Sequence, residues 1–431
     1  MCRCSLSDGV AHPGLESWIL GREVKDGIAV LVETSTTRGR DLVRGVAAFA
    51  RDHGTWSLFV EPRGRGERLT LPSAWSGAGV IADIDRSELA EQLASAALPT
   101  VCVSWFIQRA SNVARVTIDE GATARLASEH LLDRGLRHLA VLPARDYAGF
   151  IDNLTPAFTR LAREADATCN VFDRASNGLG GLAREQRLAT LGAWLASLPK
   201  PVGVIASSDV EAAWLTDACD SAGLRVPIDV AVLGCEQDEL SRLSSNPPLS
   251  SVHHDFESLG YAAAGALHAM MNGAATPTDS VQLAPAAVVS RESTDTLAVG
   301  DEQLQRVCAY IREHADHPIG VEDLLDQVRM SRRGLERRFM KVLGRTPAAT
   351  IRRIRVERAM RMIVDSDDSL RSIASACGFG NTGGLTRAFI AELNVKPAAM
   401  RKRGAAQTGD DDDDQTETDQ SESTADVGFN A

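Results

Sequence analysis

Two successive helix-turn-helix patterns between Gly320 and Arg403 constrain the fold of this chain more than any other feature. In the first pattern, apolar residues recur at helical spacing up to Val328, and Ser331 is then placed to cap a second helix. That second helix carries Leu335 and Phe339 on an apolar stripe, with basic residues around it. One buried stripe beside an exposed basic surface predicts a small helical domain whose second helix faces DNA.

The second pattern repeats this design. Leu385, Phe389 and Ile390 are predicted to point inward, and Arg387 is predicted to point outward. A helix predicted over residues 347–364 has its own apolar face and joins the two units. Two such units fixed at one angle predict contact with two successive major grooves, which lie about 34–36 Å apart.

These residues resemble the AraC-type DNA-binding domain. The resemblance rests on spaced motifs in the order of that family, which are Met330-Ser331 to Phe339, Gly344 to Pro347, Arg355 to Ala359, Ile373 to Phe379, Leu385 to Phe389, and Lys396-Pro397. It implies a transcription regulator that binds double-stranded promoter DNA. The positions expected to contact DNA are Ser331, Arg332, Arg333, Glu336, Arg337, Asn381, Thr382, Gly383 and Arg387.

Side-chain chemistry divides the DNA positions. Arg333 and Arg337 suit guanine, whereas Glu336 suits cytosine, and each good pair discriminates between bases by about 1–3 kcal/mol. In the second unit, Gly383 opens its helix poorly. We therefore expect Arg387 to be the main base reader there, while the other basic side chains hold phosphates.

The charge of the chain is divided in the same way. The whole chain has a net charge of −12, but residues 301–403 carry +7 and residues 404–431 carry −9. The remaining residues, 1–300, carry −10. A basic module on an acidic body fits a DNA reader attached to a part that does not touch DNA. Residues 404–431 are almost free of apolar side chains, which predicts a disordered acidic tail.

From Gly27 onward, short apolar strands alternate with amphipathic helices. Strands are predicted at 28–32, 56–60, 79–81, 100–103, 113–118, 139–141, 168–172, 202–206, 230–233 and, as the last, 281–283, with helices at 40–50, 121–132, 211–222 and 256–271. This alternation predicts βαβ units and parallel sheets. Residues 27–295 are too many for one ordinary sheet, so we expect two lobes, with the DNA-binding domain over 296–403 and residues 1–26 unassigned.

The order of motifs in this α/β region is similar to the sugar-binding domain of LacI-type repressors and type I periplasmic binding proteins. The matching stretches are Asp119-Glu120-Gly121, Ser207-Ser208-Asp209, Gly234 to Gln237, and Pro248 to Val252. Such a sensor ahead of an AraC-type domain resembles the XylR class of xylose regulators. The resemblance implies a sugar-like effector such as xylose, a homodimer, activation of transcription, and RNA polymerase as a further partner.

Candidate ligand residues follow directly on predicted strands, because open parallel sheets bind ligands at the carboxyl ends of their strands. The strand ends supply Ser35, Trp105, Asp209 and Glu236, and Phe150 is a second candidate for the aromatic ring that covers a sugar. The resemblance adds Arg40, Asn153 and His254. Alternative roles remain open: Asp209 would also suit a helix cap, and the two aromatic residues would also suit a core.

Two residues depart from the XylR-like pattern. Arg38 stands where an aromatic residue is expected, and Gly149 stands where an arginine is expected before Phe150. An added guanidinium favours an acidic ligand such as a uronate or a sugar phosphate. Xylose is therefore one of several effectors that the sequence allows, and a non-sugar ligand or a protein partner is the alternative.

No catalytic motif, metal-ligand spacing or cofactor-binding pattern appears in the sequence, so we expect neither an enzyme nor a cofactor. An α/β enzyme with a DNA module is the least favoured alternative. The eight cysteines form no CxxC pairs, and no apolar run is long enough to span a bilayer. The first residues also lack the apolar core of a signal peptide, so we expect a cytoplasmic protein without a membrane partner.

Overall fold

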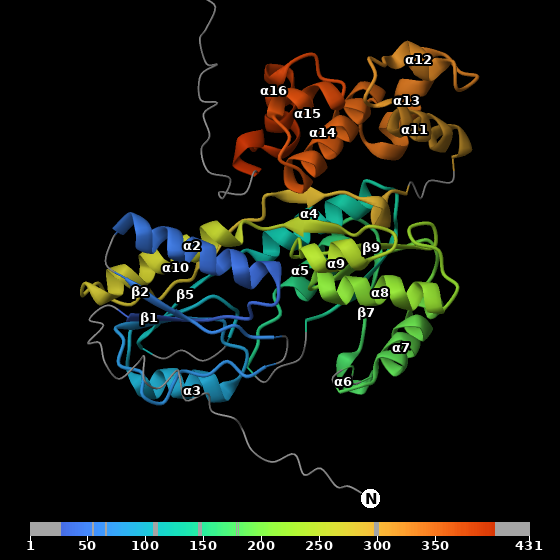
Figure 1. Cartoon of the computed structure of the whole chain (residues 1–431). Coiled ribbons are helices and arrows are strands. Elements are labelled where there is room, and N and C mark those ends of the chain that lie inside the picture. The colour runs from blue at the N-terminus through green and yellow to red at the C-terminus, as the bar shows by residue number, and fades with distance from the viewer. Residues whose placement is uncertain are drawn as a thin grey trace, which may run out of the picture.

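The computed structural model describes residues 27–400 apart from 54–55, 65–66, 107–110, 145–148, 178, 180 and 297–300. Two α/β lobes lie side by side, and a smaller helical domain lies over them (Figure 1). The predicted fold class, a two-lobed α/β sensor with an all-α double helix-turn-helix domain, is confirmed. The predictions for residues 1–26 and for the acidic tail lie outside the described residues.

The first lobe is built on a six-stranded sheet in the order β11-β5-β4-β3-β1-β2, with all neighbouring strands parallel. Its strands are β1 (Gly27–Leu31), β2 (Ser57–Val60), β3 (Gly79–Ala82), β4 (Thr100–Cys102), β5 (Val113–Ile118) and β11 (Val281–Leu283). Helices α2 (Thr37–His53) and α10 (Phe256–Met271) cover one face, and α3 (Ser87–Ala96) covers the other (Figure 1). Burial on both faces explains why these strands read as continuous apolar runs.

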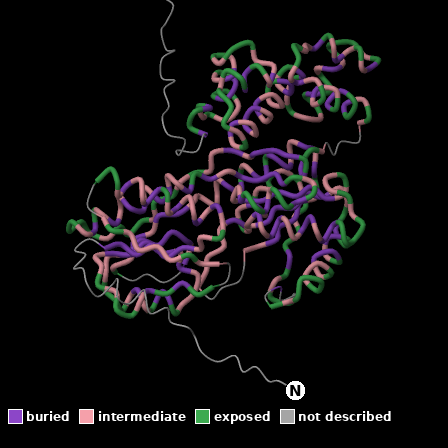
Figure 2. The backbone as a smooth tube through the Cα atoms, viewed as in Figure 1, coloured by how far each residue is buried: buried purple, intermediate pink, exposed green. Residues whose placement is uncertain are grey.

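The second lobe repeats this layout with the strand order β12-β10-β9-β8-β6-β7, in which only β12 is antiparallel to its neighbour. The strands are β6 (His138–Leu142), β7 (Thr168–Val171), β8 (Val202–Ala206), β9 (Val230–Gly234), β10 (Ser250–His253) and β12 (Ala287–Val289). Helices α4 (Glu120–Leu132) and α5 (Leu154–Glu164) cover one face, and α7 (Arg184–Ser197) and α8 (Asp209–Ser221) cover the other. Buried residues concentrate along the two sheets (Figure 2).

The sequence pattern did not resolve every element of the lobes. Helices α3, α5, α6 (Arg174–Asn177), α7 and α9 (Glu239–Ser244) and strand β10 were not predicted. The expectation that residues 281–283 form the last strand is wrong, because β12 follows. The chain crosses between the lobes near residues 118–120, 253–256 and 283–287, so each lobe combines distant parts of the sequence. Among the described residues, no helix is long and apolar enough to cross a membrane.

The helical domain contains two helix-turn-helix units. The first comprises α12 (Val321–Leu325) and α13 (Arg332–Leu343), with α11 (Glu302–His314) packed against them. The second comprises α15 (Leu370–Ala376) and α16 (Thr382–Leu393), and α14 (Pro347–Asp365) joins the two units. Side-chain caps start both second helices, because Ser331 accepts the N–H of Gly334 and Asn381 accepts the N–H of Gly384.

One predicted inward residue of the second unit points outward. Ile390 is 44% exposed, although Leu385 and Phe389 are fully buried as predicted. The buried stripe is completed by Ala388 instead. Because successive helical residues are rotated by about 100° around the axis, the residue after Phe389 turns away from this stripe.

The two helix-turn-helix units contact the sensor differently. Ala287 and Val289 of β12 belong to the same hydrophobic cluster as Phe389 and the buried face of α14, so the second unit shares a core with the second lobe. The first unit has a separate core. Polar contacts near it join the sensor, since Arg345 after α13 pairs with Asp133 at 2.6 Å and Arg312 of α11 pairs with Asp295 at 2.8 Å.

Candidate functional site

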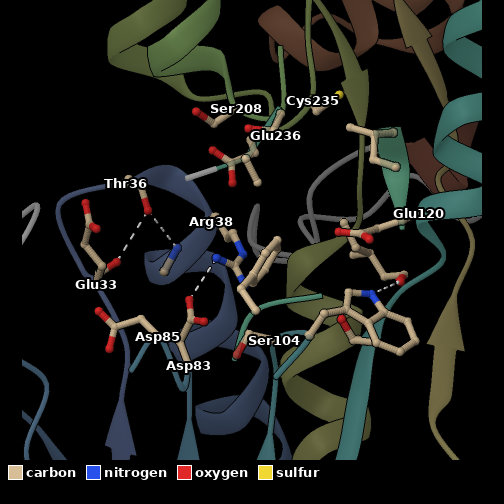
Figure 3. Close-up of a pocket in the computed structure, with 18 of the residues that line it drawn as sticks. Glu33, Thr36, Arg38, Asp83, Asp85, Ser104, Glu120, Ser208, Cys235 and Glu236 are labelled. Carbon is tan, nitrogen blue, oxygen red and sulfur yellow. Dashed lines mark hydrogen bonds and ion pairs between the residues drawn. The ribbon is translucent and has the colours of Figure 1, made fainter. Parts of the chain in front are cut away.

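A cavity of about 250 Å³ lies between the two lobes (Figure 3). Residues that follow β1, β3 and β4 form one wall, and residues that follow β8 and β9 form the opposite wall. The cavity therefore occupies the carboxyl ends of strands from both sheets, which is the position where open parallel sheets bind ligands.

The first wall is organised around Arg38, near the start of α2. Its Nη1 donates to Asp83 Oδ2 at 2.8 Å (Figure 3). Its Nη2 donates to the Val103 carbonyl at 3.3 Å. The guanidinium lies 5.7 Å from the ring centre of Phe256. Burial lowers the pKa of Arg38, but the carboxylates of Asp83 and Glu236 raise it by more, so the side chain keeps its charge.

The second wall carries Glu236 on the loop that follows β9. Asp209 lies behind this loop and is 1% exposed. It accepts the N–H of Glu236 at 3.1 Å, the N–H of Asp238 at 2.7 Å and the hydroxyl of Ser251 at 2.6 Å. Burial raises the pKa of Asp209 to about 6. Asp209 thus shapes the loop that presents Glu236 to the cavity.

Trp105 and Phe150 form the aromatic part of the lining. The indole N–H of Trp105 donates to the Ile118 carbonyl at 3.3 Å, and the guanidinium of Arg115 lies 5.4 Å from its ring centre. Phe150 is placed by an isolated β-bridge to Phe106. Fixed aromatic rings beside polar groups are typical of a site that binds a small polar molecule with apolar C–H faces.

Gly149 is required by the local backbone. Its φ is 96°, and a Cβ at this position would lie 2.6 Å from the Phe106 ring. Both features oppose any larger residue. The arginine that the family pattern led us to expect here is therefore incompatible with the way this chain places Phe150.

Carboxylates dominate the lining of the cavity. Eight of the described lining residues are acidic, namely Glu33, Glu67, Asp83, Asp85, Glu120, Asp152, Glu211 and Glu236. Arg38 is the one basic side chain among the described lining residues. Three of the acids form ion pairs with arginine, which are Asp83 with Arg38, Asp85 with Arg86 and Glu211 with Arg174. The lining as described therefore carries an excess of negative charge.

Glu120 has a strongly perturbed carboxyl in the lining. Burial raises its pKa to about 7, even though one oxygen accepts the N–H of Asn153 at 2.9 Å. A carboxyl with this pKa is present in both protonation states near neutral pH. Glu120 can therefore donate a hydrogen bond in one state and accept in the other.

The outward face of α13 carries the predicted DNA contacts of the first unit. Arg333 and Arg337 are exposed. Arg332 is engaged on the protein surface, because it pairs with Glu322 at 2.6 Å and with Glu336 at 3.1 Å. A cytosine contact by Glu336 would therefore exchange an ion pair for a base contact.

The outward face of α16 carries fewer charged groups. Arg387 and Gly383 are exposed, and Thr382 is half-buried. Ser331 and Asn381, which were predicted to contact DNA, use a side-chain oxygen to cap their own helices. Capping leaves both residues exposed at the N-terminal ends of α13 and α16, where backbone N–H groups suit phosphate.

Comparisons with known proteins match both parts of the chain. Family models match for the XylR N-terminal domain at residues 27–118, a periplasmic binding protein-like domain at 128–294 and a helix-turn-helix domain at 324–403. The xylose operon regulatory protein of Escherichia coli (strain K12) is 29% identical over 381 residues, which cover 87% of this chain and 96% of that protein. A solved structure of the xylose-binding transcription activator xylR has a TM-score of 0.56 and 26% identity, covering 88% of this chain and 98% of that chain. The chain is a XylR-like transcription regulator.

The helix-turn-helix part of this XylR-like regulator also matches other regulators. The HTH-type transcriptional activator RhaS of Citrobacter koseri is 29% identical over 105 residues, which cover 24% of this chain and 38% of that protein. These relatives are named as regulators of transcription.

In this XylR-like regulator, four of the nine predicted ligand residues line the cavity, namely Arg38, Trp105, Phe150 and Glu236. Asp209 does not, and the cap of α8 is Ser208 rather than Asp209. Ser35 is exposed and donates to Glu33 at 2.7 Å.

The other three predicted ligand residues also lie outside the lining. Arg40 donates to the backbone carbonyl of Ser35 at 2.8 Å, which shapes the loop after β1. Asn153 precedes α5, and its Nδ2 is buried with no hydrogen-bond partner among the described residues. His254 is 4% exposed, and burial lowers its pKa to about 3, so its ring is neutral.

Sequence reasoning missed several acidic lining residues. Asp83 and Asp85 follow β3 as directly as Trp105 follows β4, so the same strand-end rule applied to β3 would have found them. Glu33 follows β1 in the same way. Glu120 stood in a quoted family motif but had no role assigned.

Proposed function

We propose that this regulator binds double-stranded promoter DNA under the control of a sugar-like effector, D-xylose or a related sugar, held between the lobes. The cavity carries this proposal, because carboxylates that accept hydroxyl hydrogens lie beside the aromatic ring of Trp105. Relatives named for xylose support a pentose. In this reading residues 27–295 sense the effector and residues 296–403 bind DNA.

The charge of the cavity favours a neutral effector with many hydroxyl groups over an acidic one. Arg38 first suggested a uronate or a sugar phosphate, but its guanidinium already pairs with Asp83 at 2.8 Å. A further anion would face the acidic lining, including Glu33 and Glu236, in a partly desolvated site, where like charges repel strongly. A neutral sugar instead donates hydrogen bonds to the same oxygens.

The same excess of carboxylates supports a second candidate, an effector that carries an amine. An ammonium group donates three hydrogen bonds and would reduce the negative charge of the lining.

Thermal unfolding of the purified chain tests the effector. We expect D-xylose or another neutral sugar to raise the melting temperature, with no rise from D-glucuronate or glucose 6-phosphate. The rise should disappear in Glu236→Gln, which changes a lining residue, and persist in Glu239→Gln, which changes an exposed glutamate nearby. A rise with D-glucosamine alone would support the amine candidate, and a rise with the acidic sugars alone would contradict both.

We also propose that the regulator acts as a homodimer, without enzymatic turnover, and contacts RNA polymerase when it activates. Two protomers would place four helix-turn-helix units on DNA. Sedimentation of the protein with and without promoter DNA tests the dimer. A transcription assay with purified RNA polymerase tests activation, and repression in that assay would reverse the proposed sign.

A further inference from the structure

Arg291 is a buried arginine between the cavity and the DNA-binding domain. It follows β12, and its side chain is 3% exposed. Its Nε and Nη2 donate to the two carboxylate oxygens of Asp365 at 3.1 and 2.7 Å. Its Nη1 donates to the Leu249 carbonyl at 2.9 Å, and Nη2 also donates to Gln237 Oε1 at 3.3 Å. The side chain of Arg291 thus contacts both the second lobe and the DNA-binding domain.

Gln237 belongs to the loop of residues 234–238, which we call the cleft loop. This loop carries Glu236 into the cavity wall. The N–H groups of Glu236 and Gln237 each donate to Ser251 Oγ at 3.1 Å, and Gln237 Nε2 donates to the Ser251 carbonyl at 3.1 Å. The backbone of Gln237 is left-handed, with φ of 56°. A non-glycine residue in this conformation persists because its surroundings hold it there.

Asp365 is the last residue of α14, the helix that joins the two helix-turn-helix units. Asp365 also has a second basic neighbour, because its Oδ1 lies 3.8 Å from Nε of Arg242 in helix α9 (Glu239–Ser244). Helix α9 starts directly after the cleft loop, and Asp238 at its start accepts the N–H of Thr37 from the opposite lobe at 3.0 Å. Asp365 therefore contacts two arginines beside the cleft loop, and the start of α9 is in turn hydrogen-bonded to the opposite lobe.

We infer that Arg291 is a positioning residue that couples the cleft loop to α14, so that occupancy of the cavity changes the placement of the DNA readers. A buried guanidinium cannot lose its carboxylate partner without a large cost, so Arg291 and Asp365 move together. The planar fork of arginine fixes direction as well as distance. A shift of Gln237 on effector binding is then transmitted to the end of α14.

The first test needs no effector. In the full chain, Asp365→Asn should raise the amide hydrogen exchange rate of the cleft loop by about threefold or more, although Asp365 lies in the DNA-binding domain. Asp367→Asn removes the same charge from an exposed position two residues further on and should leave that exchange unchanged. Unchanged exchange in Asp365→Asn, or an equal rise in both variants, would overturn the inference.

The second test rests on the proposed function and uses D-xylose as the probe. We compare DNA affinity with and without saturating D-xylose in each variant. The change caused by D-xylose should be at least about threefold smaller in Asp365→Asn and in Arg291→Lys than in the natural chain, but unaltered in Asp367→Asn. An unaltered change in Asp365→Asn would refute the coupling. If D-xylose alters neither melting nor DNA binding of the natural chain, the proposed effector is wrong, and the exchange test still decides the role of Arg291.

Discussion

Ser251 donates its hydroxyl hydrogen to Asp209 at 2.6 Å and at the same time accepts the N–H groups of Glu236 and Gln237. Asp209 also accepts two backbone N–H groups from the loop that bears Glu236. These two buried side chains therefore act as the scaffold of the cavity wall, and Glu236 is the residue of this group that reaches the effector space.

Asp209→Ala should lower the free energy of unfolding by about 2–4 kcal/mol, because buried N–H groups lose their acceptor. Urea denaturation measures this loss. Asp220→Ala, at an exposed position of the same helix, should change stability by less than about 0.5 kcal/mol. A loss of effector binding in Asp209→Ala without a loss of stability would instead mean that Asp209 touches the effector directly.

Glu120→Gln should weaken the dependence of stability on pH. The folded-state pKa of Glu120 is about 7 and its ordinary value is 4.5, so between these values the folded protein keeps a proton that the unfolded chain has lost. The stability from this proton is full below pH 4.5 and is lost as pH rises through 7. From pH 5 to 8, the free energy of unfolding should fall by about 2–3 kcal/mol more in the natural chain than in Glu120→Gln.

Urea denaturation of both proteins across that pH range measures the difference. Exposed Glu91→Gln serves as the control and should follow the natural chain. Parallel curves for the natural chain and Glu120→Gln would show that Glu120 is ionised throughout this range.

Arg337→Ala and Arg333→Ala should each relax the sequence preference of DNA binding by about 1–3 kcal/mol at one base position. Arg338→Ala should weaken binding to all sequences alike and reduce the salt slope by about one, because we expect Arg338, an exposed basic residue of α13, to hold a phosphate. Binding to a library of operator variants at two salt concentrations distinguishes these outcomes. A uniform loss in all three variants would show that α13 reads no bases through these arginines.

Arg387→Ala should remove most of the base preference of the second unit. The reason is that the other predicted contacts on α16 are a capping Asn381, a half-buried Thr382 and Gly383, which has no side chain. Hydroxyl-radical footprinting should still show both units on DNA, since phosphate contacts remain. Unchanged sequence preference in this variant would refute the role given to Arg387.

Gly149→Ala should destabilise the protein by about 1–3 kcal/mol, through a left-handed backbone and contact with the Phe106 ring. Gly181→Ala provides the control, because Gly181 also has a positive φ but has no atom within 4 Å of its Cβ position. The larger loss at Gly149 measures the steric part. Calorimetry measures the loss of stability in both variants. Equal losses would mean that the placement of Phe150 does not depend on the close contact between Gly149 and Phe106.

The fold class and most element positions could be predicted because they depend on local periodicity. Helices α3 and α5 were missed although their apolar residues lie on one face, and β12 was missed although β11, an edge strand of equal length, was predicted. The sharing of β12 with the core of the second helix-turn-helix unit depends on packing between segments far apart in sequence. Local periodicity contains no such information.

The candidate site was predictable to the extent that side chains follow strand ends. That rule places Trp105 and Glu236 on the lining. It could not reveal that Arg38 is neutralised by Asp83, because the two residues are 45 positions apart. It also could not predict that Glu236 lines the cavity whereas Asp209 is buried behind the loop. Both residues follow a strand, and the sequence does not distinguish the two positions.

Helix α14 sets a fixed distance inside the DNA-binding domain. It contains 19 residues and is roughly 28 Å long at the usual rise of an α-helix. Because Asp365 and Glu357 of this same continuous helix contact the sensor, the sensor can tilt both readers as one body but cannot alter their separation. The length of α14 therefore fixes the separation of the two ends on which the helix-turn-helix units pack. A change of side chains in the cavity therefore leaves this separation untouched, because none of the described lining residues belongs to α14.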